Sequence, residues 1–413
     1  MDISQLNENN LDDFVNWVDN NGGPSILNDV KIQQKFKYHI STIVDTGLEP
    51  TSEEYVEQQM QLYREIANRK IDQLVNEQTD FNIEAHSISC NPYNISDPSN
   101  FVFHYLRLGH LIQQAGFNPN PNILDMGCGW GLSTEFLGNL GASVTAVDIN
   151  PKFISLVERR SSKNLYNIKT CVSSFIDFFT VEKYDGILFY ECLHHSLDVT
   201  RLIEKLKYFL KPGGSIILGG EPIQSMYWDS WGIRLDALSI YCIRKFGWFE
   251  SGWSEEFIDH AFKRLSFDVN IKLHPEPIIG YTLSAKLSAK IYYATDLGDF
   301  LRFENWYIEE HFYICKGNST IFELKSMISS DTSGLNFCIY NFSSDKIRCN
   351  VIIDKKKKNI LFNTGHNVMF LNNEELDSDV TFECTTWQPS QKLEDSSDNR
   401  IMSFHLFAIE IVK

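Results

Sequence analysis

Between residues 120 and 220, short apolar blocks alternate with longer stretches of mixed apolar and polar residues. The short apolar blocks have the length of buried strands, and the longer stretches between them have the character of helices. Strands that alternate with helices are typical of a parallel sheet with crossover helices. The pattern therefore predicts an α/β fold with strands near residues 123–126, 144–148, 168–172, 184–190 and 210–218.

Two regions of different character flank this core. Residues 1 to about 95 have helical patterns, with heptad-like apolar spacing from Tyr55 to Val75. Beyond Lys316, short β-rich runs are separated by Ser, Asn, Asp and Gly, which predicts an antiparallel β-sandwich. We therefore expect a helical region (1–95), a central domain (96–316) with an aromatic insertion at about 223–310, and a β-sandwich (317–413).

Composition excludes several classes of function. The formal net charge is −17 and no basic stripe is present, so a nucleic-acid backbone is not an expected partner. The chain has no run of eighteen apolar residues and a polar N-terminus, so neither a membrane span nor a secretory signal is expected. Nine cysteines without C-x-x-C pairs suit a reducing cytoplasm better than a disulfide framework. The oligomeric state stays open.

The most informative motif follows the first predicted strand. That strand delivers Asp125 into a loop with glycines at positions 127, 129 and 131, and a helix and a second strand ending in Asp148 come next. Glycines let a backbone approach a ligand closely, and a carboxylate at the second strand tip accepts hydrogen bonds from ribose hydroxyls. A glycine-rich turn in an ordinary α/β domain is the alternative interpretation.

The glycine spacing separates two kinds of ligand. A dinucleotide site has G-x-G-x-x-G, whereas this loop has G-x-G-x-G behind an acidic residue, which suits a ligand carrying an amino acid. The stretch Leu124-Asp-Met-Gly-Cys-Gly-Trp-Gly131 resembles the signature of class I S-adenosylmethionine (SAM)-dependent methyltransferases. The resemblance implies a Rossmann-like core and SAM as the cofactor. Relatives often hold the adenine with an Asp where this chain has Ser174. The cofactor contacts that the resemblance implies are Asp125, Gly127, Cys128, Gly129, Gly131, Asp148, Ile149, Ser174, Phe175 and Glu191.

Three titratable residues follow the fourth and fifth strands, where ligands bind in open α/β sheets. They are His194, His195 and Glu221. Methyl transfer to an alcohol needs alignment and removal of the hydroxyl proton, which a histidine can accept. We expect His195 to be the base, with His194 next and Glu221 as an orienting group or acceptor ligand. Either histidine could instead only pack or cap the loop.

A divalent ion is a weaker interpretation of the same cluster. His194, His195, Asp198 and Glu221 could bind one, but their spacing is not a ligand signature, and hard cations prefer more carboxylates. No metal is therefore predicted.

An aromatic segment follows the fifth strand. Tyr227, Trp228 and Arg234 could form an acceptor wall by stacking on sugar rings and binding hydroxyls. The alternative is that these aromatic residues pack as a lid or core.

The order of these motifs resembles methyltransferases encoded among bacterial surface-polysaccharide genes, which implies a sugar hydroxyl of a surface glycan or its precursor as the acceptor. The C-terminal region resembles a domain appended to such enzymes, with Trp387, Asp398 and Arg400 as a sugar-binding patch or an internal turn. A methyltransferase for a small natural product or lipid, and a non-catalytic SAM-binding protein, are the alternatives.

Overall fold

The computed structural model describes residues 1–164, 166–223, 228–276, 278–309, 311–389, 398 and 400–412, without the side chains of residues 100 and 377. The chain divides into two compact units, Met1–Leu287 and Ser288–Lys413. Each unit has its own sheet and its own apolar core.

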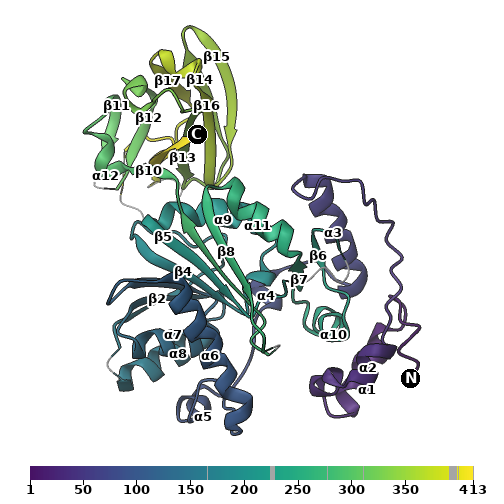
Figure 1. The fold of residues 1–413 in the computed structure, drawn as a ribbon. Coiled ribbons are helices and arrows are strands. Elements are labelled where there is room, and N and C mark those ends of the chain that lie inside the picture. Colours follow the sequence, from purple (N-terminus) through teal and green to yellow (C-terminus); the bar gives the residue numbers. More distant parts are fainter. Residues whose placement is uncertain are drawn as a thin grey trace. The chain divides into compact units, whose positions relative to one another are not determined.

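A seven-stranded sheet is the centre of the first unit (Figure 1). Its order is β3-β2-β1-β4-β5-β9-β8, in which β9 alone runs opposite to the other strands. The five parallel strands coincide with the predicted ones within one or two residues, and the predicted Rossmann-like α/β core is confirmed. The strands are β1 (Asn122–Met126), β2 (Ser143–Asp148), β3 (Ile168–Val172), β4 (Tyr184–Tyr190), β5 (Leu210–Gly219), β8 (Phe267–Leu273) and β9 (Tyr281–Leu287).

Helices cover both faces of this sheet. One face carries α6 (Pro98–Ala115), α7 (Leu132–Asn139) and α8 (Pro151–Asn164), and the other carries α9 (Val199–Leu206) and α11 (Glu255–Arg264) (Figure 1). The apolar residues of α6 and α7 in this core include Leu108, Leu111 and Leu132. They pack on apolar residues of β1, β2, β4 and β5, which include Ile123, Val144, Leu188 and Ile217. Burial of these aliphatic side chains fixes the strand ends that carry the candidate site.

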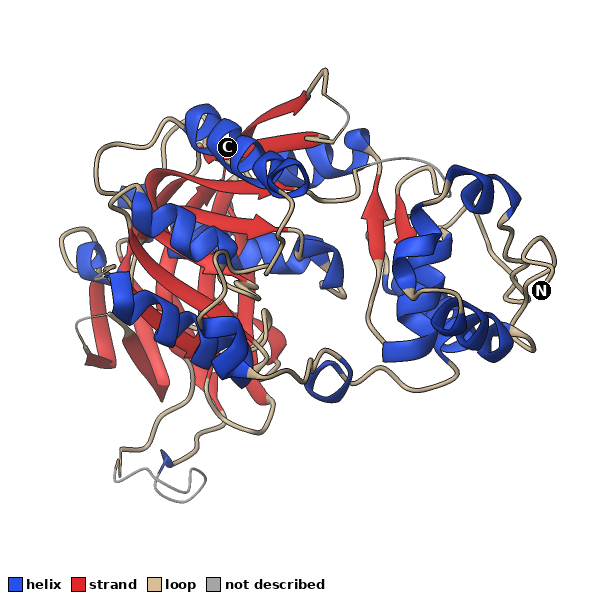
Figure 2. Cartoon of the chain, turned by 90° about the horizontal axis from the view of Figure 1, so that it is seen from below, coloured by secondary structure: helices blue, strands red, loops and turns tan. Residues whose placement is uncertain are grey.

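The N-terminal region is helical, as predicted (Figure 2). The heptad-like spacing from Tyr55 to Val75 runs over two separate helices. Asn68 adopts a left-handed conformation with φ +52° and ends α3, because this backbone geometry cannot continue a right-handed helix. The elements are α1 (Leu11–Asn20), η1 (Pro24–Asn28), α2 (Val30–Lys35), α3 (Glu53–Ala67), α4 (Gln73–Asn76) and α5 (Ile83–Ser87).

The predicted aromatic segment packs against these N-terminal helices. It contains β6 (Trp231–Ile233), α10 (Ala237–Phe246) and β7 (Ser251–Trp253). The Tyr55 hydroxyl donates to the carbonyl of Trp231, and the Tyr63 hydroxyl donates to the carbonyl of Gly247. Trp231, Phe249 and Trp253 are buried, so for these three rings the core interpretation holds.

The second unit is one nine-stranded antiparallel sheet around a single apolar core, rather than two separate sheets. The long strand β12 connects its halves, because Tyr313 and Ile314 pair with β18 whereas residues 318–321 pair with β17. The elements are β10 (Lys290–Tyr293), α12 (Ala294–Leu297), β11 (Arg302–Ile308), β12 (Tyr313–Phe322), η4 (Leu324–Met327), β13 (Gly334–Asn341), β14 (Ile347–Ile353), β15 (Lys356–Phe362), β16 (Gly365–Asn372), η5 (Glu375–Asp377), β17 (Val380–Cys384) and β18 (His405–Val412).

The division between the units falls at 287/288, ahead of the expected boundary at 316/317. The reason is hydrogen bonding: β10 pairs with β18, and β11 pairs with β12. Both strands lie inside the segment that the sequence pattern assigned to the aromatic insertion.

Two further details of the second unit bear on the sequence expectations. Cys349 and Cys384 are direct cross-strand partners on β14 and β17 and form a disulfide, although no disulfide framework was expected. Trp387 is buried and donates its indole N–H to the carbonyl of Ser403, while Asp398 accepts hydrogen bonds from Arg400. This arrangement fits the internal turn better than an exposed sugar patch. No described helix is long and apolar enough to cross a membrane.

Candidate active site

The glycine loop connects β1 to α7 at the carboxyl edge of the parallel strands. Gly127, Gly129 and Gly131 all have positive φ angles, of 73°, 48° and 87°. A Cβ on Gly127 would lie 2.8 Å from Sγ of Cys192, and one on Gly131 would lie 2.9 Å from Val157, whereas a Cβ on Gly129 would meet no atom within 4 Å. The first and third glycines therefore allow close packing, and the second leaves open space in which a ligand can approach the backbone.

Asp148 at the tip of β2 lies directly beside this loop. Its two carboxylate oxygens accept the N–H of Gly129 at 2.9 Å and the N–H of Asn150 at 2.8 Å. Burial raises the pKa of Asp148 to about 6, although the backbone N–H groups and nearby His195 favour the charged form. The carboxylate thus stands where a ribose is bound in nucleotide-binding folds.

Asp125 has a different local role. Its carboxylate turns toward the start of α7, where it accepts hydrogen bonds from Ser133 at 2.8 Å and Thr134 at 2.6 Å. Burial raises its pKa to about 6, against the effect of these two hydroxyls. Asp125 therefore fixes the loop to the helix, and a direct cofactor contact stays a prediction.

The remaining expected cofactor residues surround the same edge. Cys128 is buried in the loop, and the ring of Phe175 lies 5.4 Å from that of Phe189. Ser174 donates to Asp177 at 2.5 Å, so a carboxylate is present here even though Ser174 replaces the Asp of many relatives. The carbonyl of Ile149 accepts from Gln78 at 3.4 Å.

Glu191 follows β4 and is held in a strained conformation. Its φ is +57°, its N–H donates to the carbonyl of Gly219, and its carboxylate accepts from Arg107 at 2.6 Å and from Tyr93 at 3.4 Å. A positive φ in a non-glycine residue costs energy that the surroundings must offset, which makes this position a functional candidate.

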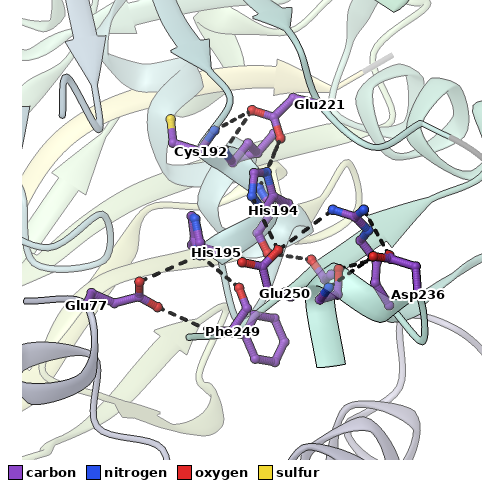
Figure 3. Close-up of polar contacts among 12 residues, drawn as sticks. Glu77, Cys192, His194, His195, Glu221, Asp236, Phe249 and Glu250 are labelled. Atoms are coloured by element: carbon purple, nitrogen blue, oxygen red, sulfur yellow. Dashed lines mark hydrogen bonds and ion pairs between the residues drawn. The ribbon is translucent and has the colours of Figure 1, made fainter. Parts of the chain in front are cut away.

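Glu221 organises the turn after β4, the 3₁₀ helix η2 (Leu193–His195) (Figure 3). Its carboxylate accepts the N–H groups of Cys192, Leu193 and His194 at 2.8–3.1 Å and faces Nδ1 of His194 at 2.9 Å. Burial pushes the pKa of Glu221 up, but His194 and the N–H groups outweigh it, so this pKa lies below its usual value. Burial lowers the pKa of His194, but Glu221 and Glu250 outweigh it and raise the pKa overall.

His195 is the more accessible histidine, with 22% of its side chain exposed against 11% for His194. Its Nδ1 lies 2.9 Å from the carbonyl of Phe249 and 3.7 Å from the carboxylate of Glu77. Because a carbonyl can only accept a hydrogen bond, Nδ1 carries a proton, and in the neutral imidazole Nε2 is the nitrogen with the free lone pair. The two imidazole rings lie 4.3 Å apart (Figure 3).

The structure places the expected acceptor residues in different ways. Arg234 reaches the cluster, since it pairs with Asp236 at 2.9 Å and approaches Glu250 at 3.7 Å. Trp228 is half-buried and donates its indole N–H to the carbonyl of Ile233. Tyr227 lies outside the described residues.

Sequence reasoning missed several residues of the cluster. Glu77 accepts the N–H of Phe249 and faces His195, and Gln73 donates to the carbonyl of His195 at 2.7 Å. Both come from the N-terminal region, to which no role in the site was assigned. Glu250 lies 3.7 Å from Nε2 of His194. Asp198, which the sequence offered as a possible metal ligand, instead caps α9 by accepting the N–H of Arg201. No local pattern marks Glu77 or Glu250.

Comparison with known proteins defines the class of the core. A family model described as "Methyltransferase domain" matches residues 124–218, which span β1 to β5 and include both the glycine loop and the His194–His195 turn. This match confirms the methyltransferase domain that the resemblance of residues 124–131 implies.

Among curated proteins, the chain is similar to the ubiquinone biosynthesis O-methyltransferase of Xanthomonas campestris pv. campestris, with 32% identity over 102 residues, 24% of this chain and 43% of that protein. It is also similar to the enzyme of the same name from Actinobacillus pleuropneumoniae, with 31% identity over 115 residues, 26% of this chain and 49% of that protein. The chain thus spans about half the length of these relatives. A similar solved structure is N-methyltransferase NodS from Bradyrhizobium japonicum in complex with S-adenosyl-L-homocysteine, at 18% identity and a TM-score of 0.37, covering 52% of this chain and all of that one.

Proposed function

We propose that this protein is a SAM-dependent methyltransferase that transfers a methyl group to a hydroxyl of a small-molecule or glycan acceptor. The observation that carries the proposal is the convergence of two features at one sheet edge. The open backbone at Gly129 and the carboxylate of Asp148 form a nucleoside cradle, and the His194–His195 turn follows β4 at the same edge. The matched methyltransferase domain contains all of these residues.

The cofactor would bind along the glycine loop. Asp148 would accept hydrogen bonds from the ribose hydroxyls, Phe175 and the Ser174–Asp177 pair would surround the adenine, and Glu191 would face the amino-acid end. When bound, SAM supplies an electrophilic methyl group on a sulfonium. The curated relatives are named O-methyltransferases, which supports an oxygen acceptor.

The proposed proton acceptor is His195. Its Nδ1–H is fixed by the Phe249 carbonyl, so the Nε2 lone pair can take the hydroxyl proton as the new C–O bond forms and the C–S bond breaks. His194 is a positioning residue, because Glu221 holds both its ring and its backbone. Alignment of oxygen and methyl carbon supplies the rest of the rate enhancement.

For the acceptor, we propose a sugar hydroxyl of a surface glycan or its precursor. Charged groups at the cluster, Arg234, Asp236 and Glu250, suit a polyhydroxyl compound better than a purely apolar one. A lipid-like phenol is the second candidate, favoured by the name of the curated relatives.

Calorimetric titration with SAM and, separately, with NAD tests the cofactor. Binding of SAM without a response to NAD is expected, and binding of NAD alone would overturn the proposal. A labelled methyl donor then tests the acceptor: label in oligosaccharides or nucleotide sugars but not in quinols supports the sugar, and the reverse favours the lipid-like phenol.

A further inference from the structure

The two histidines form a compact cluster with Glu250 that the proposed reaction does not fully use. One ligand atom from each of His194, His195 and Glu250 lies within 4.8 Å of the others. Nε2 of His194 lies 3.7 Å from the carboxylate of Glu250. Ligand atoms around a tetrahedral zinc ion lie roughly 3.3 Å apart, given Zn–N bonds of about 2.0–2.1 Å. Small side-chain rotations would therefore bring the three atoms into a coordination sphere.

The groups behind the histidines are those that orient metal ligands in other proteins. A metal-bound histidine almost always donates its second ring N–H to a carboxylate or a backbone carbonyl, which fixes the tautomer. Here Nδ1 of His194 faces Glu221, and Nδ1 of His195 faces the carbonyl of Phe249 with Glu77 behind it. Nε2 of His194 is left as a ligand atom beside Glu250, and the orienting groups of both rings are in place without an ion (Figure 3).

The electrostatic surroundings also favour a cation. Three carboxylates, those of Glu77, Glu221 and Glu250, lie beside the two imidazoles, and each side chain is at least 88% shielded from solvent. Arg234 brings a positive charge to within 3.7 Å of Glu250. Two imidazoles with one carboxylate select a borderline transition metal rather than Mg²⁺ or Ca²⁺, which prefer oxygen ligands.

We propose that His194, His195 and Glu250 form a binding site for a divalent transition-metal ion such as Zn²⁺, and that occupancy of this site inhibits methyl transfer. The inhibition rests on the proposed function. A metal on Nε2 of His195 takes the lone pair that would accept the hydroxyl proton, and a metal on Nδ1 moves the ring proton to Nε2 with the same result. The site is thereby a regulatory one, in which free enzyme is active and metal-loaded enzyme is not.

Calorimetric titration of the untagged full-length protein with ZnCl₂, in a buffer with a non-thiol reductant, tests the site directly. One ion per chain is expected. Glu250→Gln, which removes one ligand charge at nearly constant volume, and His194→Gln should each weaken binding by at least about tenfold. His260→Gln is the matched control, because His260 is exposed on α11 and lies outside the cluster. Circular dichroism melts establish that the variants are folded.

A second titration with CoCl₂ adds a readout that protein folding cannot imitate. Intense visible absorption bands of low-symmetry Co²⁺ should appear in the wild-type protein and in His260→Gln, and should weaken in Glu250→Gln. The absence of stoichiometric Zn²⁺ binding, or binding that survives both cluster substitutions, would overturn the site. It would favour the competing state, a protonated His194 held between Glu221 and Glu250.

Turnover measurements separate the two proposals. Activity should fall in proportion to zinc occupancy and return on addition of EDTA. Zinc binding with unchanged methyl transfer would overturn the inhibition while leaving the site intact. A protein that binds zinc but never transfers a methyl group would refute the proposed function and, with it, the inhibitory role, because the calorimetric result does not depend on turnover.

Discussion

At the scale of single residues, Asp148 joins the fold to the proposed chemistry. Its carboxylate is buried, holds the N–H of Gly129, and has a pKa raised to about 6. Ribose hydroxyls donate to the ionised carboxylate, so cofactor affinity should be full above pH 7 and should fall as Asp148 gains a proton below pH 6. The expected loss approaches tenfold per pH unit, the limit for one proton.

The measurement for this prediction is the SAM dissociation constant between pH 5 and 8 in wild type and in Asp148→Asn. The variant should bind SAM at least about tenfold more weakly at pH 7.5, since a charge-assisted hydrogen bond contributes about 1.5–3 kcal/mol. It should also lack the decline at low pH. An equal decline in the variant would assign the pH dependence to another group.

His195 gives a second prediction at this scale. Replacement by Gln removes the proton acceptor but keeps a polar side chain beside Phe249. Turnover should fall by about 10²–10⁴, the usual contribution of general base catalysis, with SAM affinity unchanged. Rapid-quench measurement of a single turnover isolates the chemical step, and an unaltered rate would remove His195 from the proposed role.

Part of the site could be predicted from single residues and part could not. The glycine loop and Asp148 could be predicted because positive φ angles favour glycine and because Asp148 directly follows an apolar strand. His194, His195 and Glu221 were readable because each follows a parallel strand. Glu77 and Glu250 were not, since only tertiary packing brings them to the histidines.

At the scale of secondary structure elements, neighbouring residues on α8 have contrasting environments. Arg160 pairs with Glu135 of α7, and their side chains are only 8% and 11% exposed. The preceding residue, Arg159, pairs with Glu84, at 53% and 73% exposure. The same kind of ion pair therefore links α8 to one element in the core and to another in solvent.

Arg160→Met should lower the free energy of unfolding by about 3 kcal/mol, because it leaves the Glu135 carboxylate buried without its partner. Arg159→Met, the matched control, should change it by less than about 1 kcal/mol, because exposed pairs contribute little. Urea denaturation of both variants checks the prediction. Similar losses in the two would show that the burial of the Arg160–Glu135 pair does not set its contribution to stability.

The elements themselves were largely predictable where periodicity is strong. Strands β1, β2, β4 and β5 could be predicted because each contains a short apolar run between longer stretches of other character. The heptad-like spacing did not indicate where α3 ends, because it continues across Asn68, whose left-handed conformation breaks the helix. The sequence pattern placed the residues of β10 and β11 in the aromatic insertion, whereas both strands pair within the sheet of the second unit. Their pairing with β18 and β12 is a long-range property that local sequence does not indicate.

At the scale of the whole molecule, the chain consists of two units with separate cores. A fragment of residues 288–413 should therefore fold by itself, with the far-ultraviolet spectrum of a β protein and cooperative unfolding. A fragment of residues 1–287 should keep full SAM affinity. Calorimetry and thermal melts of the two fragments check both expectations, and loss of SAM binding in the first unit would show that the cofactor needs the second.

The pairing of the N-terminal helices with the aromatic segment has a consequence for biosynthesis. The bonds from Tyr55 to Trp231 and from Tyr63 to Gly247 close loops of 176 and 184 residues. At about 5–20 residues per second, a ribosome needs roughly 10–40 s to deliver these partners. During that interval the apolar faces of α1 and α3 have left the exit tunnel without their native cover. The segment that contains α1 and α3 is therefore the part of the nascent chain that we expect ribosome-associated chaperones to hold.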